Sequence, residues 1–227
     1  MTLFTNIIDI INEHGIAFLE ASWMTIAITV ISLLFAMIIG LIFASFKISS
    51  NKVLNWIADL YIGIIRGTPL IVQIMFLYYG IANFVTLNSF TAGALALGIH
   101  TGAYIAEIIR GAVQSIDRGQ LEAARSLGMP RSLAMRRIIL PQAFKRAIPP
   151  LGNQFIISLK DSSLVAYISV TDLYNTALTV QGENYMPFET YFVVGLYYLV
   201  IVLIFTFITN KVEKKLDVSK PKGAVLA

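Results

Sequence analysis

The sequence predicts an all-α membrane protein with five transmembrane helices, an interfacial helix at the N-terminus and one long helical loop between spans. Three observations support this class. Hydrophobic residues make up 57% of the 227 and charged residues 13%, against roughly 25% charged in a typical soluble domain. The mean hydropathy is +0.75. Apolar segments recur at the length of ~20 residues that a helix needs to cross a bilayer.

The five apolar segments that could span a membrane are residues 22–46, 56–84, 91–112, 147–170 and 188–210. The fourth is interrupted by Pro149, Pro150 and several polar residues. Broken helices at membrane depth are tolerated where they face protein or a water-lined cavity. We therefore expect the fourth segment to pack inside the assembly.

Ahead of the first span, Ile7, Ile8 and Ile11 alternate with polar and acidic residues at helical spacing. This pattern predicts an amphipathic helix along the outer membrane surface; the alternative is a frayed terminus with chance periodicity. A cleaved signal peptide is not expected, because no basic residue precedes the apolar run.

The basic residues predict the orientation. Of the 17 lysines and arginines, 15 fall in the regions 47–52, 110–146 and 211–222, which lie on one side if there are five spans. The other side, residues 1–21, 85–90 and 171–187, has none. Because cytoplasmic loops are enriched in basic residues, we expect the N-terminus outside and the C-terminus in the cytoplasm. Residues 1–215 form one domain in this interpretation, and 216–227 are a cytoplasmic tail.

The loop at about 111–146 carries a helix, a glycine and a second helix. Gly128 suits the positive φ of a helix end, and Pro130 suits the first turn of the next helix. A helix-turn-helix DNA-binding element would look similar, with Arg131, Arg136 and Arg137 on phosphates. That class is disfavoured because the loop has no further residues to build the core around the two helices.

The residues of this loop carry a specific motif. Glu122-Ala123-Ala124 is followed by Gly128 and, after nine more residues, by Ile138-Ile139-Leu140-Pro141. The motif resembles the EAA loop of permease subunits in bacterial ABC importers, and the resemblance implies that the chain lies in a bacterial cell membrane. The resemblance implies a cytoplasmic coupling helix that docks on a separate ATPase subunit through Glu122, Ala123, Ala124, Leu127 and Gly128.

No phosphate-binding loop of the form G-x-x-x-x-G-K-[ST] occurs in the sequence. We therefore expect the chain to bind no cofactor and to have no ATPase activity of its own, with ATP and Mg on the partner subunit. The chain has no cysteine, so neither a disulfide framework nor a thiolate metal site is available, and no metal site is predicted.

Three further stretches, 66–73, 101–111 and 159–164, resemble signature segments of polar amino acid permeases, the subunits of importers for glutamine, histidine, arginine, glutamate or cystine. With the EAA loop, the resemblance covers roughly residues 20–215. It implies an extracytoplasmic binding protein and a second permease, either another copy or a paralogue, as partners. The competing class is a secondary transporter or channel that works without an ATPase.

Charged residues inside spans are costly and usually functional. The sequence places both signs there, and His100, Tyr104 and Glu107 share one helix face, as do Gln154 and Asp161. Together these residues predict a cavity for a polar zwitterion, with glutamine or cystine favoured and a basic amino acid possible. The candidate substrate-binding residues are Asp161, Gln154, Tyr104, Glu107, His100, Arg66 and Lys160. The alternative is that Arg66–Glu107 and Lys160–Asp161 are purely structural pairs.

Small residues four apart, Gly63 with Gly67 and Gly98 with Gly102, allow helices to approach closely. We expect packing within the chain at these positions rather than a dimer seam.

Overall fold

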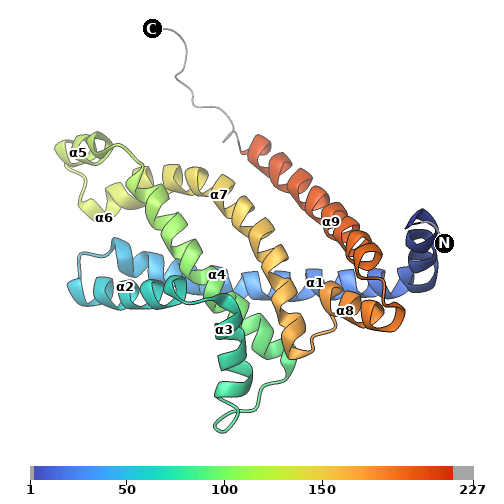
Figure 1. The fold of residues 1–227 in the computed structure, drawn as a ribbon. Helices are drawn as coiled ribbons and strands as arrows, with labels where there is room; N and C mark the ends of the chain where they lie inside the picture. Colours follow the sequence, from blue (N-terminus) through green and yellow to red (C-terminus); the bar gives the residue numbers. More distant parts are fainter. Residues whose placement is uncertain (1–2, 217–227) are drawn as a thin grey trace.

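The computed structural model of the protein describes residues 3–216, and the regular structure in this range is entirely helical (Figure 1). The elements in chain order are α1 (Leu3–Ile48), α2 (Lys52–Gly67), α3 (Leu70–Met75), the π-helical η1 (Phe76–Gly80), α4 (Ser89–Gln114), α5 (Arg118–Ser126), α6 (Arg131–Ala134), the π-helical η2 (Met135–Ile139), α7 (Leu140–Asp161), the 3-10 segment η3 (Ser162–Ile168), α8 (Leu173–Asn184) and α9 (Pro187–Lys215).

Three of these helices, α1, α4 and α9, are long and apolar enough to cross a membrane. The second expected span is broken into α2 and the α3–η1 segment, which meet at an angle of 104°. If this bent pair counts as one span, the number of apolar spans in residues 3–216 is four. Helix α7, within the fourth expected span, is not in this group; it carries four charged residues and two internal prolines. By length and composition, three or four of the described helices qualify as apolar spans, and the count of five stays a prediction.

The N-terminal segment is not a separate interfacial helix. Residues 3–48 form one continuous α-helix of 46 residues, although its first turns point away from the axis of the rest in Figure 1. Ile10 and Phe18 are buried in a cluster with Leu173 of α8 and Val193 of α9. Of the apolar residues expected on the lipid-facing side, Ile7 packs against this cluster, whereas Ile8 and Ile11 are exposed.

The main contact of the fold is between α1 and α4. A Cβ atom at Gly98 would lie 2.8 Å from Cβ of Phe35 and 3.1 Å from the backbone oxygen of Ser32. Gly98 and Gly102 therefore pack within the chain, as predicted. The prediction is wrong for Gly63 and Gly67, since no other described atom lies within 4 Å of a Cβ built at either position.

The short helices α5 and α6 form a hairpin at one end of the molecule. They lie beyond the C-terminal end of α4 and on the same side as the C-terminal end of α9 (Figure 1). The hairpin is joined to the spans by a small apolar cluster that includes Ile116, Ile139 and Ala143. Its orientation is thus set by packing against the membrane helices.

Candidate functional site

Local backbone signals mark both ends of helix α5, the first helix of the hairpin. The Asp117 carboxylate accepts a hydrogen bond from the Gly119 amide at 2.8 Å, which caps α5. At the other end, Gly128 has φ of +82°, and the Met129 amide donates to the Ala124 carbonyl at 3.1 Å. A left-handed residue of this kind is the usual device that ends a helix. The predicted positive φ at Gly128 is confirmed.

The five residues expected to dock on an ATPase do not share one surface. Glu122, Ala123, Leu127 and Gly128 are exposed, and Leu127 retains 84% of its surface. Ala124 is only 2% exposed, because α5 packs against α6 and η2. Ala124 therefore stabilises the hairpin, and an exposed apolar side chain is presented instead by Leu127.

A chain of polar side chains follows one face of α4. Glu107 accepts two hydrogen bonds from Arg110, Nε to Oε1 at 2.9 Å and Nη2 to Oε2 at 2.8 Å. The second arginine, Arg66 of α2, lies farther away, with Nη1 3.7 Å from Oε2 of Glu107. Arg66 also lies over the Tyr104 ring, 5.2 Å from its centroid. Bidentate arginine–carboxylate geometry is the stronger kind, so Arg110 is the principal partner of Glu107.

Arg110, the partner of Glu107, is not among the site residues predicted from the sequence. The two residues are three apart on one helix, a spacing at which opposite charges meet, and that signal was available. The Arg66–Glu107 pair, considered above as the structural alternative, does form, with a longer distance than the Arg110–Glu107 pair.

His100 extends the same tract toward the bend between α2 and α3. Its Nδ1 lies 3.1 Å from Oε1 of Gln73, and its ring centroid is 5.2 Å from that of Tyr104. The Gln73 amide nitrogen also donates to the Ile65 carbonyl and to Oγ1 of Thr68, each at 2.8 Å. Gln73 therefore links the bend to α4, and it too was missing from the predicted residues.

The remaining candidates lie on α7, on a different side of α4. Thr101 and Ser158 share a buried hydrogen bond of 3.0 Å, and Gln154, one turn before Ser158, is 6% exposed. Neighbouring residues on a helix point about 100° apart, so His100 and Thr101 face different partners. Across residues 3–216, no hydrogen bond or ion pair joins the α7 candidates to the His100–Glu107 tract.

Lys160 and Asp161 do not form the structural pair considered above. The close ion pairs of the described chain include neither residue. Lys160 is exposed and Asp161 is half-buried. The seven candidates are therefore divided into two sets, with Arg66, His100, Tyr104 and Glu107 in contact on one side and Gln154, Lys160 and Asp161 on the other.

Long apolar helices, a polar tract within them and a hairpin of short helices at one end define a helical membrane transport protein. Residues 36–218 match the sequence model of the family described as "Binding-protein-dependent transport system inner membrane component". The chain belongs to this family, whose members are membrane permease components of transport systems.

Relatives of known role agree with this assignment. The "Glutamine transport system permease protein GlnP" of Escherichia coli (strain K12) is 38% identical over 203 residues, covering 88% of this chain and 93% of the relative. The "Arginine transport system permease protein ArtQ" of Bacillus subtilis (strain 168) is 38% identical over 200 residues, covering 87% and 91%.

Solved structures show the same fold. A chain from the "Crystal structure of an amino acid ABC transporter with histidines" has a TM-score of 0.86 and 40% identity, with 90% of this chain and 96% of that chain covered. A chain of the MetNI methionine ABC transporter, in an inward-facing conformation, has a TM-score of 0.78 at 19% identity over 89% and 97%, and supports the fold alone.

Proposed function

We propose that this chain forms half of the translocation pathway of an ATP-driven importer for a polar amino acid. The observation that carries the proposal is the α5–α6 hairpin, in which the EAA sequence turns at Gly128 with φ of +82° and leaves Glu122, Ala123 and Leu127 exposed. The glutamine and arginine permeases that resemble the chain over almost their whole length support an amino acid substrate.

The proposed membrane topology has five crossings: α1, the bent α2–η1 pair, α4, the α7–η3 segment and α9. In this arrangement the N-terminus is outside, and the hairpin and the C-terminus are cytoplasmic, with residues 1–215 as one domain. The segregation of 15 of the 17 basic residues supports it. Residues 216–227 are the proposed cytoplasmic tail; all but Leu216 lie outside the described residues.

The proposed partners are an ATPase subunit that carries ATP and Mg, an extracytoplasmic binding protein and a second permease. The chain itself would hold no cofactor and catalyse no hydrolysis. Leu127 and Glu122 offer an apolar and a charged contact to the ATPase. The open surface around Gly63 and Gly67, flanked by exposed Trp56 and Leu60, suits close approach of a second permease.

For the substrate, we infer that the two polar sets line opposite parts of one pathway. Glu107 already has two arginine partners, which favours an organising role for Arg66, Tyr104 and Glu107. Asp161 has no close ion pair in the described chain and Gln154 is buried, which favours them as contacts for an ammonium group or a polar side chain. His100 and Lys160 complete the proposed lining. This mixed set suits a neutral polar amino acid such as glutamine.

The test is ATP-dependent uptake in vesicles containing the chain, its ATPase and its binding protein. Asp161→Asn should keep its membrane yield and raise KM roughly ten- to a hundredfold, the loss expected for one charge-assisted hydrogen bond. Asp59→Asn is the matched control, because Asp59 pairs with Lys47 near the cytoplasmic end and should leave KM unchanged. An Asp161→Asn protein with unchanged KM for every amino acid removes Asp161 from the site. Uptake that persists without ATP contradicts an ATP-driven importer and favours the secondary transporter.

A further inference from the structure

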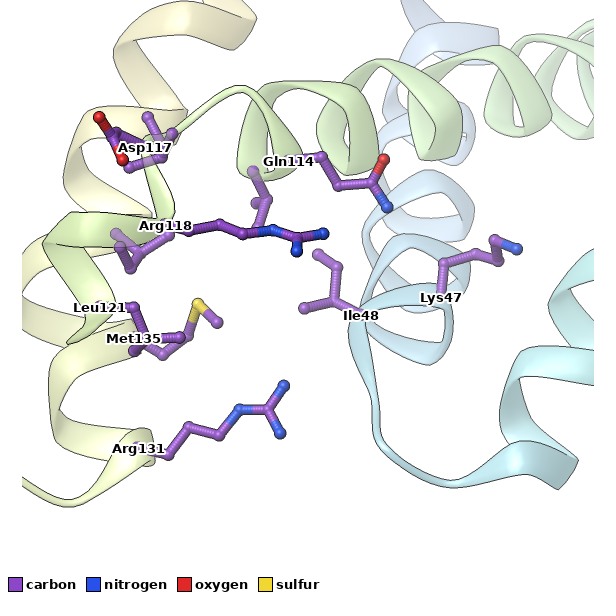
Figure 2. Close-up of a pocket in the computed structure, with 11 residues that line it drawn as sticks. Lys47, Ile48, Gln114, Asp117, Arg118, Leu121, Arg131 and Met135 are labelled. Atoms are coloured by element: carbon purple, nitrogen blue, oxygen red, sulfur yellow. The ribbon is translucent and has the colours of Figure 1, made fainter. Parts of the chain in front are cut away.

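A cavity of about 510 Å³ lies between the α5–α6 hairpin and the end of α1. Lys47, Arg118 and Arg131 line it, and Asp117 is the one carboxylate among its lining residues. Figure 2 shows the side chains of Arg118 and Arg131 extending from the hairpin toward the wall formed by Ile48 and Gln114. The Asp117 carboxylate points away from these guanidinium groups in the same view, and its Oδ1 accepts from the Gly119 amide.

The positive charge of this cavity is only partly compensated. Lys47 is paired with Asp59 at 2.5 Å. Arg131 donates one hydrogen bond to the Ser50 hydroxyl at 3.2 Å, and Arg118 takes part in no close ion pair of the described chain. Two guanidinium groups therefore face one cavity without a carboxylate partner. Arginine is the side chain best suited to bind phosphate oxygens in a bidentate manner.

A separate apolar groove adjoins this cavity. It has a volume of about 200 Å³, and Val113 lines both spaces. On α1, Met37 and Leu41 line the groove and Ile48 lines the cavity; these positions, four and then seven residues apart, fall on one helix face. The groove is completed by Ile109, Leu140, Phe144 and Leu151, among other apolar residues. A cationic pocket and an apolar groove thus share Val113 as a wall residue and lie next to each other along α1.

We propose that the cavity and groove together bind one anionic phospholipid, with its phosphate between Arg118 and Arg131 and an acyl chain along Leu41 and Phe144. The charge of the pocket suits a phosphate, and the adjoining groove distinguishes a lipid from a free anion. Anionic headgroups are concentrated at the cytoplasmic leaflet, the side on which this end of the chain is proposed to lie. A bound lipid would connect the hairpin to the end of α1. This inference depends on the membrane setting of the chain and not on its substrate.

The test is a lipid titration of the purified full-length chain, followed by native mass spectrometry. Dioleoyl phosphatidylglycerol should bind at least about tenfold more tightly than dioleoyl phosphatidylcholine. The double variant Arg118→Gln with Arg131→Gln should lose that preference, since each lost charge-assisted contact typically weakens binding about tenfold or more. The matched control, Arg136→Gln with Arg137→Gln, removes the same charge from exposed positions that do not line the cavity and should bind as the original chain does.

Further arms distinguish the ligand sources. Dihexanoyl phosphatidylglycerol and glycerol 3-phosphate should both bind more weakly than the dioleoyl lipid, because they fill little or none of the groove. If glycerol 3-phosphate binds as tightly as the dioleoyl lipid, the cavity is a site for a free phosphate and the proposal of a lipid ligand is wrong. If the control double variant loses the preference for phosphatidylglycerol to the same extent, the attraction is a general effect of positive charge, and the proposal of a specific site is wrong. If the double variant fails to insert, Arg118→Gln alone serves, because this side chain forms no close ion pair in the described chain; unchanged lipid affinity there also overturns the proposal.

Discussion

At the scale of single residues, Gly128 has the clearest structural requirement in the chain. Its φ of +82° lies in the left-handed region, while a Cβ atom at this position would meet no other described atom. The constraint is therefore conformational and not one of space. A β-branched residue resists this conformation most.

Gly128→Val should weaken the hairpin by about 1–2 kcal/mol and uncouple transport from ATP hydrolysis, while the protein still reaches the membrane. Substrate-stimulated ATPase activity and uptake in the reconstituted complex are the measurements. Gly111→Val is the control, because Gly111 lies in α4 with ordinary helical φ and open space around it. Normal coupling in the Gly128 variant would contradict the proposed role of the turn.

Asp172 is a second residue with a specific structural environment, because its carboxyl group is buried and has a raised pKa. It lies between η3 and α8, outside the proposed spans, and its side chain is completely buried. Burial raises the pKa of Asp172 to about 6, against the opposing effect of hydrogen bonds from the Asn175 amide at 2.9 Å and the Tyr198 hydroxyl at 3.4 Å. The folded state therefore holds a proton more tightly than the unfolded state does.

The sign of the pH effect follows from linkage. Between about pH 4 and pH 6 the folded chain binds more protons, so the contribution of Asp172 to stability decreases as the pH rises. Asp172→Asn keeps an N-cap side chain and should stabilise the protein by up to about 3 kcal/mol above pH 6, with little effect near pH 4. Thermal unfolding in detergent across this range measures the difference. If the difference in stability between the original chain and Asp172→Asn does not change with pH, the raised pKa of Asp172 is contradicted.

At the scale of elements, the close packing of α1 on α4 organises the fold. The absence of a side chain at Gly98 allows the backbone of α4 to approach Ser32 and Phe35. The bend between α2 and α3 is a different kind of element contact, in which Gln73 bonds both the bend and His100.

Gly98→Val should lower the free energy of unfolding by about 1–3 kcal/mol, the usual cost of overpacking a core. Gly63→Val is the matched control, since a Cβ at Gly63 meets no other described atom and the stability of the single chain should be unchanged. Thermal unfolding of both purified variants tests this. If Gly98→Val and Gly63→Val have equal melting temperatures, the close approach of α1 and α4 at Gly98 does not contribute to stability, and the prediction is wrong. If Gly63→Val instead reduces dimer formation, the open α2 surface is an interface.

At the scale of the whole molecule, the arrangement of helices relative to the membrane can be tested directly because the chain has no cysteine. Cysteines at Phe84 and Glu183 should react with an impermeant thiol reagent from outside intact cells, and one at Ser132 should not. All three positions are exposed. Phe84 is preferred to Asn88 because the Asn88 side chain caps α4 by accepting from the Thr91 amide. Labelling at Ser132 with protection at Phe84 would overturn the proposed topology.

The sequence by itself determined the class of protein, the helical character of the hairpin and the need for a positive φ at Gly128. These features depend on composition, apolar length and local backbone preference, which are properties of neighbouring residues. The family motif was also readable from linear spacing alone.

Only the tertiary structure decided which faces meet. It showed α1 as one continuous helix, the 104° bend after α2, the burial of Ala124 and the contact of Gln73 with His100. It also separated His100 from Thr101 by turning them toward different helices. Periodicity specifies which residues share a face, but the rotation of each helix against its neighbours depends on packing between segments far apart in the chain, and no local pattern contains that information.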